Sequence, residues 1–299
     1  TVSGNMKLTD VSDVAVTGKI DGKLTANGAG DISAETVEGT SNVTDAASLK
    51  ITTANGDVTA NSVAGAVDIT DLDGSADIKK AGSLKIGSAT GTVDASKISG
   101  KAEIGSASAV DINTADSVVA DNVTNGLVVK SINGTVESSG TLGSFDATDV
   151  GGATTLNDVS GRIRATDVSD LSANSAGSLS INGAGDVQVA TVNGIGDVSG
   201  AASLDITTAN GDITAKTIAG DVKLAKGTNL TVNGAGGNVS ADDISGKLKA
   251  SDIDGGITSS TNLGSLDATT VGGDISVAAV QNELKVDDVK NVSASGTVG

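Results

Sequence analysis

The side chains most able to do chemistry in this sequence are carboxylates. Of its 299 residues, 37 are Asp or Glu and all but five of those are Asp, while His and Cys are both absent. Without imidazole or thiol groups, the chain offers no zinc ligands of the usual kinds, no histidine base and no thiolate nucleophile. A carboxylate pair would still need a dry cleft to do acid–base work. The sequence therefore predicts that the protein is not an enzyme.

Calcium is the cofactor that these carboxylates suggest. Several aspartates directly follow a glycine, and copies stacked on neighbouring strands would supply the oxygen ligands that Ca²⁺ prefers. Neither an EF-hand loop nor the GGxGxDxUx nonapeptide is present. The alternative is that Asp follows Gly because both residues favour turns. The candidate calcium ligands are Asp57, Asp186, Asp212, Asp221 and Asp274.

These aspartates belong to a repeat of nine residues that occurs along most of the chain. Three copies, SLKITTANG, DVTANSVAG and AVDITDLDG, follow one another over residues 48–74, and SLDATTVGG at 265–273 has the same frame. Positions 2, 4 and 7 are apolar, and position 9 is Gly or Asn. Positions 2 and 4 have the period of a strand, and the step to 7 followed by Gly indicates a corner. The only aromatic residue, Phe145, occupies position 2.

Such a repeat predicts an all-β fold, a parallel β-solenoid of the β-helix or β-roll kind, as one continuous domain over residues 1–299. Two repeats per coil are favoured because a core without aromatics suits closely opposed sheets, and three per coil are the alternative. Antiparallel hairpins are the structural rival, since Asn-Gly and Asp-Gly are hairpin signals. Residues 107–126 and 193–202 fit the frame badly, so we expect insertions or deletions at their corners.

Charge and hydropathy exclude several partners. The net charge of −18 argues against binding to nucleic acid or to an anionic membrane surface. No apolar run approaches the ~20 residues that span a bilayer, so no membrane insertion is predicted. Both ends of the chain read as further repeat. We therefore expect either a piece of a longer chain or ends that pair with neighbouring subunits.

Two segments resemble a known kind of repeat. TTANGDVTANSVAG (52–65) and TTANGDITAKTIAG (207–220) are similar to the repeats of bacterial adhesin β-solenoid domains. The bias toward Thr, Ala, Gly, Val, Asp and Asn also resembles that of surface-layer and secreted filament proteins. The resemblance implies an extracellular or cell-surface structural protein, a building block of a surface layer, filament or adhesin stalk. Its partners would be further copies of itself, assembled into filaments or sheets, and surface polysaccharide.

Two other functions remain open at this point. A carbohydrate-binding or carbohydrate-active β-solenoid would need acidic residues clustered on one sheet, together with aromatic side chains on which sugars stack. The single Phe makes that alternative weaker. A calcium-stabilised secreted repeat module would instead need the corner aspartates to act as ligands.

Overall fold

The computed structural model describes all 299 residues and contains strands but no helices. The chain forms a parallel β-solenoid of about 17 turns, which confirms the predicted fold class. It divides into two compact units, unit 1 (Thr1–Gly152) and unit 2 (Ala153–Gly299). That the whole chain is one continuous domain stays a prediction. No helix that is long and apolar enough to cross a membrane is present.

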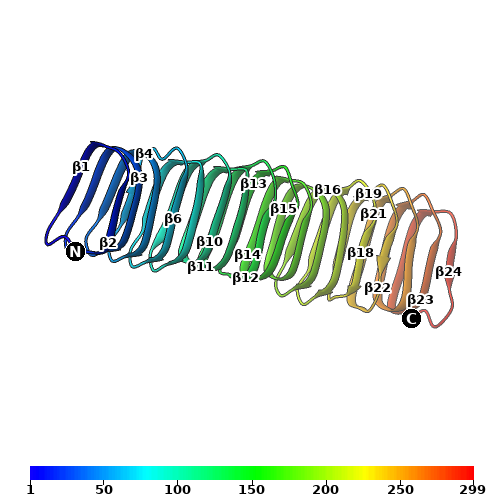
Figure 1. Cartoon of the computed structure of the whole chain (residues 1–299). Coiled ribbons are helices and arrows are strands. Elements are labelled where there is room, and N and C mark those ends of the chain that lie inside the picture. Colours follow the sequence, from blue (N-terminus) through cyan, green and yellow to red (C-terminus); the bar gives the residue numbers. More distant parts are fainter. The chain divides into compact units, whose positions relative to one another are not determined.

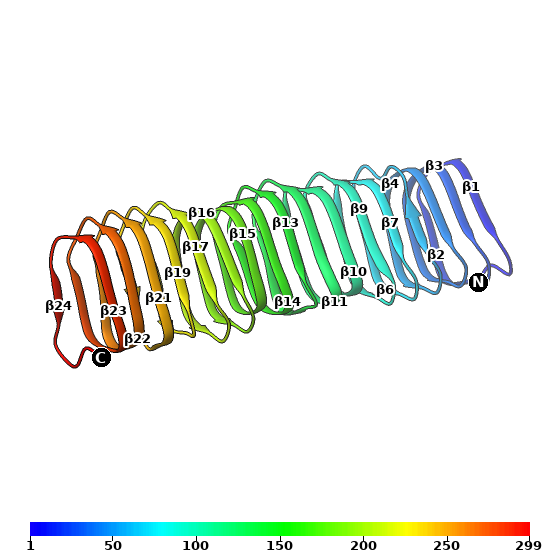
Figure 2. The same cartoon turned by 180° about the vertical axis from the view of Figure 1, so that it is seen from behind.

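Unit 1 consists of two stacks of strands, seen from opposite sides in Figures 1 and 2. The first stack starts with β1 and continues through β5, β7 and β9 to β13, and the second starts with β2 and continues through β6 and β8 to β12. The long strands β3, β4, β10 and β11 contribute to both stacks. The strand bounds are β1 (Met6–Val11), β2 (Val14–Ile20), β3 (Leu24–Val37), β4 (Ser41–Ala54), β5 (Val58–Ala60), β6 (Ala66–Leu72), β7 (Ala76–Ala81), β8 (Ser83–Ala89), β9 (Thr92–Ile98), β10 (Lys101–Ala115), β11 (Ser117–Ile132), β12 (Val136–Leu142) and β13 (Phe145–Val150).

Unit 2 repeats this arrangement. One of its stacks contains β18, β20 and β24, the other contains β17, β19 and β21, and the long strands β16, β22 and β23 contribute to both. The strand bounds are β14 (Thr154–Val168), β15 (Leu171–Val192), β16 (Gly196–Ala209), β17 (Ile213–Ile218), β18 (Val222–Lys226), β19 (Leu230–Ala235), β20 (Val239–Ala241), β21 (Ile244–Ile253), β22 (Ile257–Val271), β23 (Ile275–Val289) and β24 (Val292–Ala294).

Neighbouring coils stack in parallel and in register. Leu49 of β4 lies opposite Val67 of β6, and Leu204 of β16 lies opposite Val222 of β18. Most side-chain hydrogen bonds between neighbouring coils accordingly join residues 17 or 18 positions apart, close to twice the nine-residue repeat. That each coil contains two repeats stays a prediction. Every strand pairing described here is parallel, so the antiparallel hairpin alternative is wrong.

The inward-facing residues are those at positions 2, 4 and 7 of the repeat. Leu49, Ile51 and Ala54 are at most 1% exposed, and Phe145 is equally buried. Ile163 is buried while Arg162 and Arg164 on either side of it are exposed. Each buried Val, Leu or Ile contributes about 1.5–3 kcal/mol, so every coil adds a similar increment of stability. The predicted alternation is confirmed.

Glycine at position 9 is required for close approach between stacked corners. A Cβ on Gly56 would lie 3.0 Å from the carbonyl carbon of Gly39, and one on Gly74 would lie 2.9 Å from that of Gly56. None of these three glycines has a positive φ. Larger residues at these corners would therefore push the coils apart, although the backbone conformation itself would allow them.

Residues at position 6 of the repeat, and not the glycines at position 9, adopt the left-handed backbone conformation. At position 6 in one stack of unit 2, each successive coil has a residue with positive φ, and register pairing places these residues in one column. Gly adopts this conformation freely and Asp tolerates it, whereas a β-branched Thr is strained there. The column consists of Asp167, Gly183, Gly200, Thr217, Gly234, Asp252, Thr270 and Asp288.

The two segments that fit the repeat badly differ in cause. In 107–126 the register between β10 and β11 shifts after Ala107, so that β11 has one extra residue, as expected for an insertion. In 193–202 the register between β15 and β16 is unbroken, but only two residues separate the inward-facing Ala201 and Leu204, whereas the frame has three between positions 7 and 2, so this corner is one residue short, as expected for a deletion. Gly196 faces inward between Leu179 and Ile213, and Ile195 before it is 68% exposed. A Cβ on Gly196 would lie 2.7 Å from Cδ1 of Ile213, whose side chain therefore uses that space.

Replacing Thr217, which has a φ of 51°, with Asn tests the left-handed column. We expect T217N to raise the free energy of unfolding by about 0.5–1 kcal/mol, because Asn tolerates this conformation better than a β-branched residue. The matched control is T214N in the same strand, where the backbone is extended and Asn should instead destabilise. Urea denaturation of the three proteins measures both effects, and a destabilising T217N would contradict the assignment.

Candidate functional site

Four of the five candidate calcium ligands lie at corners directly before a strand, and Asp186 lies within the long strand β15, where the chain passes from one stack to the other. Asp57 is in unit 1 and the other four are in unit 2, and all are exposed. Asp186 is the register partner of Ser203 on the next coil. Ser203 and Asp221 occupy the same position on successive coils, because the residues that follow them, Leu204 and Val222, are register partners. Asp186, Asp221 and Asp274 therefore belong to one column of corner residues. Asp212 lies in the corner column of the other stack.

Each of these carboxylates accepts a hydrogen bond from the following coil. Oδ1 of Asp57 accepts the backbone N–H of Ser75 at 2.8 Å, and Oδ1 of Asp221 accepts that of Asn238 at 2.6 Å. The other three bond to side chains. Asp186 accepts from Ser203 Oγ at 2.6 Å, Asp212 from Asn229 Nδ2 at 2.8 Å, and Asp274 from Asn291 Nδ2 at 2.7 Å.

The hydrogen bonds continue beyond the aspartates, so that the corners form polar ladders. Oδ1 of Asn229 accepts the backbone N–H of Lys247 at 2.8 Å, and Oδ1 of Asn238 accepts that of Gly256 at 2.9 Å. In unit 1, Oδ1 of Asn5 accepts the backbone N–H of Lys23 at 2.8 Å. Such bonds satisfy backbone donors at corners, where the ladder of the strands is interrupted. The short Asp and Asn side chains therefore have a structural role whether or not calcium binds.

Spacing along the column limits what these aspartates could bind together. Asp186 and Asp221 are two coils apart, which at about 4.8 Å per coil is roughly 10 Å. Two oxygen ligands of one Ca²⁺ lie at most about 5 Å apart, because each is 2.3–2.6 Å from the ion. The structure contains no group of three or more Asp, Glu, His or Cys side chains placed to hold a metal ion. Calcium binding at these residues stays a prediction.

Unit 1 contains an acidic column that the sequence analysis missed. Asp77, Asp94 and Asp111 are register partners on three successive coils. Lys79 Nζ lies 2.7 Å from Asp77 Oδ1, and this hydrogen bond, helped by the charge of Asp94, raises the pKa of Lys79. Lys130 Nζ lies 3.2 Å from Asp111 Oδ1. The central Asp94 has no ion pair, so these like charges on neighbouring strands destabilise the fold locally.

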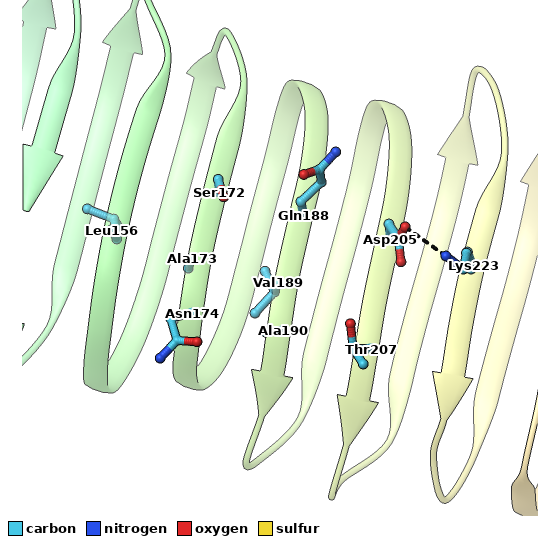
Figure 3. A pocket seen from close by; sticks show the side chains of 10 residues that line it. All are labelled: Leu156, Ser172, Ala173, Asn174, Gln188, Val189, Ala190, Asp205, Thr207 and Lys223. Atoms are coloured by element: carbon cyan, nitrogen blue, oxygen red, sulfur yellow. Dashed lines mark hydrogen bonds and ion pairs between the residues drawn. The ribbon is translucent and has the colours of Figure 1, made fainter. Parts of the chain in front are cut away.

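A shallow depression of about 420 Å³ lies on the outer face of unit 2. Figure 3 shows its outward side chains in rows across successive coils, with Gln188, Asp205 and Lys223 in one row and Asn174 and Thr207 beside it. Lys223 Nζ and Asp205 Oδ2 form an ion pair at 3.2 Å. These groups could exchange hydrogen bonds with a polar ligand such as a sugar. The carbohydrate-binding alternative stays a prediction.

An ion pair with a largely buried carboxylate lies in the other stack of unit 2. Lys247 Nζ lies 2.8 Å from Oδ2 of Asp267, which is 17% exposed, and Lys285 Nζ lies 3.8 Å from Oδ1 of the same residue. The hydrogen bond from Lys247 is the main cause that lowers the pKa of Asp267 below 3.8. The same bond raises the pKa of Lys247 above 10.5.

Comparison with protein-family models, with curated proteins and with solved structures finds no match for this chain. The resemblance to bacterial adhesin repeats therefore stays an expectation from the sequence, and function has to be argued from the geometry of the chain itself.

Removing one hydrogen bond from a polar ladder at the corners should lower the free energy of unfolding. We expect D221A to lose about 1 kcal/mol, because the backbone N–H of Asn238 loses its acceptor, and D221N to lose less, because its amide oxygen can still accept. The matched control is D254A, since Asp254 is an exposed corner residue without a side-chain hydrogen bond or ion pair in the structure. Urea denaturation measures the three variants, and equal stabilities of D221A and D254A would contradict a structural role for the ladder.

Asp267 should make stability depend on pH in a defined window. Its pKa is lower in the folded than in the unfolded chain, so it stabilises the fold above about pH 4 and loses this effect as pH falls through the lowered folded value. We expect D267N to be less stable than the parent at pH 7, with the difference shrinking towards zero near pH 2. Denaturation midpoints at both pH values measure this. A difference that is independent of pH would show that the carboxylate charge is not involved.

Proposed function

We propose that this chain is a structural protein of a microbial cell surface, located outside the cell. It would be a building block of a surface layer, filament or adhesin stalk that acts by self-assembly or adhesion. The observation that supports this most directly is the polar ladder at the corners, where Asp221, Asn238 and Gly256 join three successive coils. Because each coil repeats both the buried core and these bonds, stability increases with the number of coils.

The outward-facing residues also suit a protein that works outside the cell. The chain has no Cys whose thiol could be oxidised, and its net charge of −18 favours solubility. Divalent cations would bridge acidic surfaces of neighbouring copies, and Ca²⁺ suits the carboxylate oxygens of the corner aspartates. Surface polysaccharide is the partner we propose for adhesion, with hydrogen-bonding groups such as those around Gln188 and Asn174 as contacts.

Electron microscopy of the purified chain with and without a calcium chelator tests this function. We expect filaments or sheets in the presence of calcium and their dissociation on chelation, followed by reassembly when calcium is restored. The matched variant replaces Asp57, Asp186, Asp212, Asp221 and Asp274 with Asn, which keeps the hydrogen-bond acceptors but removes the charges. Assembly that is indifferent to both chelator and variant would contradict calcium bridging alone. Dispersed monomers under all conditions would contradict self-assembly.

A further inference from the structure

One face of unit 1 has a column of charges that alternate in sign. Lys50 of β4, Asp68 of β6, Lys85 of β8 and Glu103 of β10 are register partners on four successive coils and point outward at position 3 of their repeats. We call these four residues the charged column. Most of the side chains beside it on the same face are small, namely Ser48, Ala66, Ser83, Thr52, Thr70, Gly87 and Gly105. A flat face of this kind can come close to another flat surface.

The charges of this column are only partly used within the chain. Lys85 Nζ and Glu103 Oε1 are 3.9 Å apart, and Lys101 Nζ lies 3.4 Å from Glu103 Oε2. Lys50 and Asp68, although they are register partners, form neither an ion pair nor a side-chain hydrogen bond. The register partners Lys223 and Asp205 of unit 2, in contrast, are in closer contact at 3.2 Å. The charged column therefore has charges available to a partner.

The sign order makes the column complementary to a second copy of itself. Consider two copies packed face to face around a two-fold axis that is parallel to the strands and passes between β6 and β8. Lys50 of one copy then faces Glu103 of the other, and Asp68 faces Lys85, which gives two distinct ion pairs that each occur twice. A two-fold axis along the direction of stacking would instead place Lys50 opposite Lys50. The charges thus favour an arrangement in which the stacking directions of the two copies are antiparallel.

We propose that the charged column is an interface between two copies of this chain, packed face to face with their stacking directions antiparallel. This inference deepens the self-assembly of the proposed function and rests on it. Four coils of about 4.8 Å and five residues of about 3.3 Å give a contact of only about 300 Å² per copy, against about 800 Å² in a stable complex. The contact is consequently weak, reversible and sensitive to salt.

The neighbouring coils limit the contact to this size. In the same arrangement Ser33 of β3 would face Val119 of β11, and this pair of uncharged side chains would add no ion pair. Glu35 on the coil of Ser33 would face Asp121, so two acidic side chains would meet just beyond the charged column. The register is therefore set by the four charges at the centre and is not extended by the coils on either side.

A charge swap between copies tests the interface. The acidic variant K50E/K85E and the basic variant D68K/E103K each have a column of one sign, which repels a second copy of itself but attracts the other variant. The matched control K7E/K97E has the same net charge as the acidic variant but is changed in the first stack, where Lys7 and Lys97 are exposed and without ion pairs. Circular dichroism and denaturation midpoints establish that all variants are folded.

Sedimentation equilibrium at low and high salt gives the readout. We expect the wild type and K7E/K97E to associate at low salt, each single-sign variant to associate at least about tenfold more weakly, and an equimolar mixture of the two variants to recover association. Association that is equal in wild type and variants would overturn the interface and leave self-assembly through another surface intact. Wild type that stays monomeric at every concentration would overturn the interface and the proposed self-assembly together.

Discussion

The constraint on which this structure depends is the in-register stacking of parallel coils. Backbone groups along a strand bond alternately to the coil before and the coil after, so residues at the same position of successive coils come within about 4.8 Å of each other. Every side chain therefore has its own equivalents as its nearest neighbours. Leu49 packs beside Val67, and Asp77 lies beside Asp94, for the same geometric reason. The residue types that a position of the repeat can accept therefore depend on the residues at the same position of the two neighbouring coils.

The corners show how this constraint selects residue types for two distinct reasons. Gly56 is needed because the backbone of Gly39 leaves no space for a Cβ, although the φ of Gly56 is negative. Thr217 and Asp252, in contrast, have space for a side chain but adopt a left-handed backbone, which restricts the choice to residues that tolerate it. Both kinds of corner look alike in the sequence, as Gly, Asp, Asn and Thr between short apolar runs. Only the structure separates a steric requirement from a conformational one.

The sequence predicts this fold well because the repeat encodes burial directly. Apolar positions 2, 4 and 7 are the buried ones, and even Phe145 occupies a site that the frame assigns to the interior. The left-handed column was missed because its members, Thr217 and Asp252 among them, have no residue type in common. The acidic column Asp77, Asp94 and Asp111 was missed because its neighbours in space are two repeats apart in the sequence. Aligning every second repeat, once two per coil are assumed, would have revealed it.

The same register that builds the core also orders the outer surface. Along a column, opposite charges on neighbouring coils can pair, as Asp205 and Lys223 do at 3.2 Å, and each such pair stabilises two coils against each other. The charged column has the same alternating signs, but its register partners Lys50 and Asp68 form neither an ion pair nor a side-chain hydrogen bond. Internal stability therefore does not account fully for its order of charges, whereas pairing with a second copy does. The contact between residues at equivalent positions of successive coils can thus determine both the fold of a solenoid and its association with a second copy.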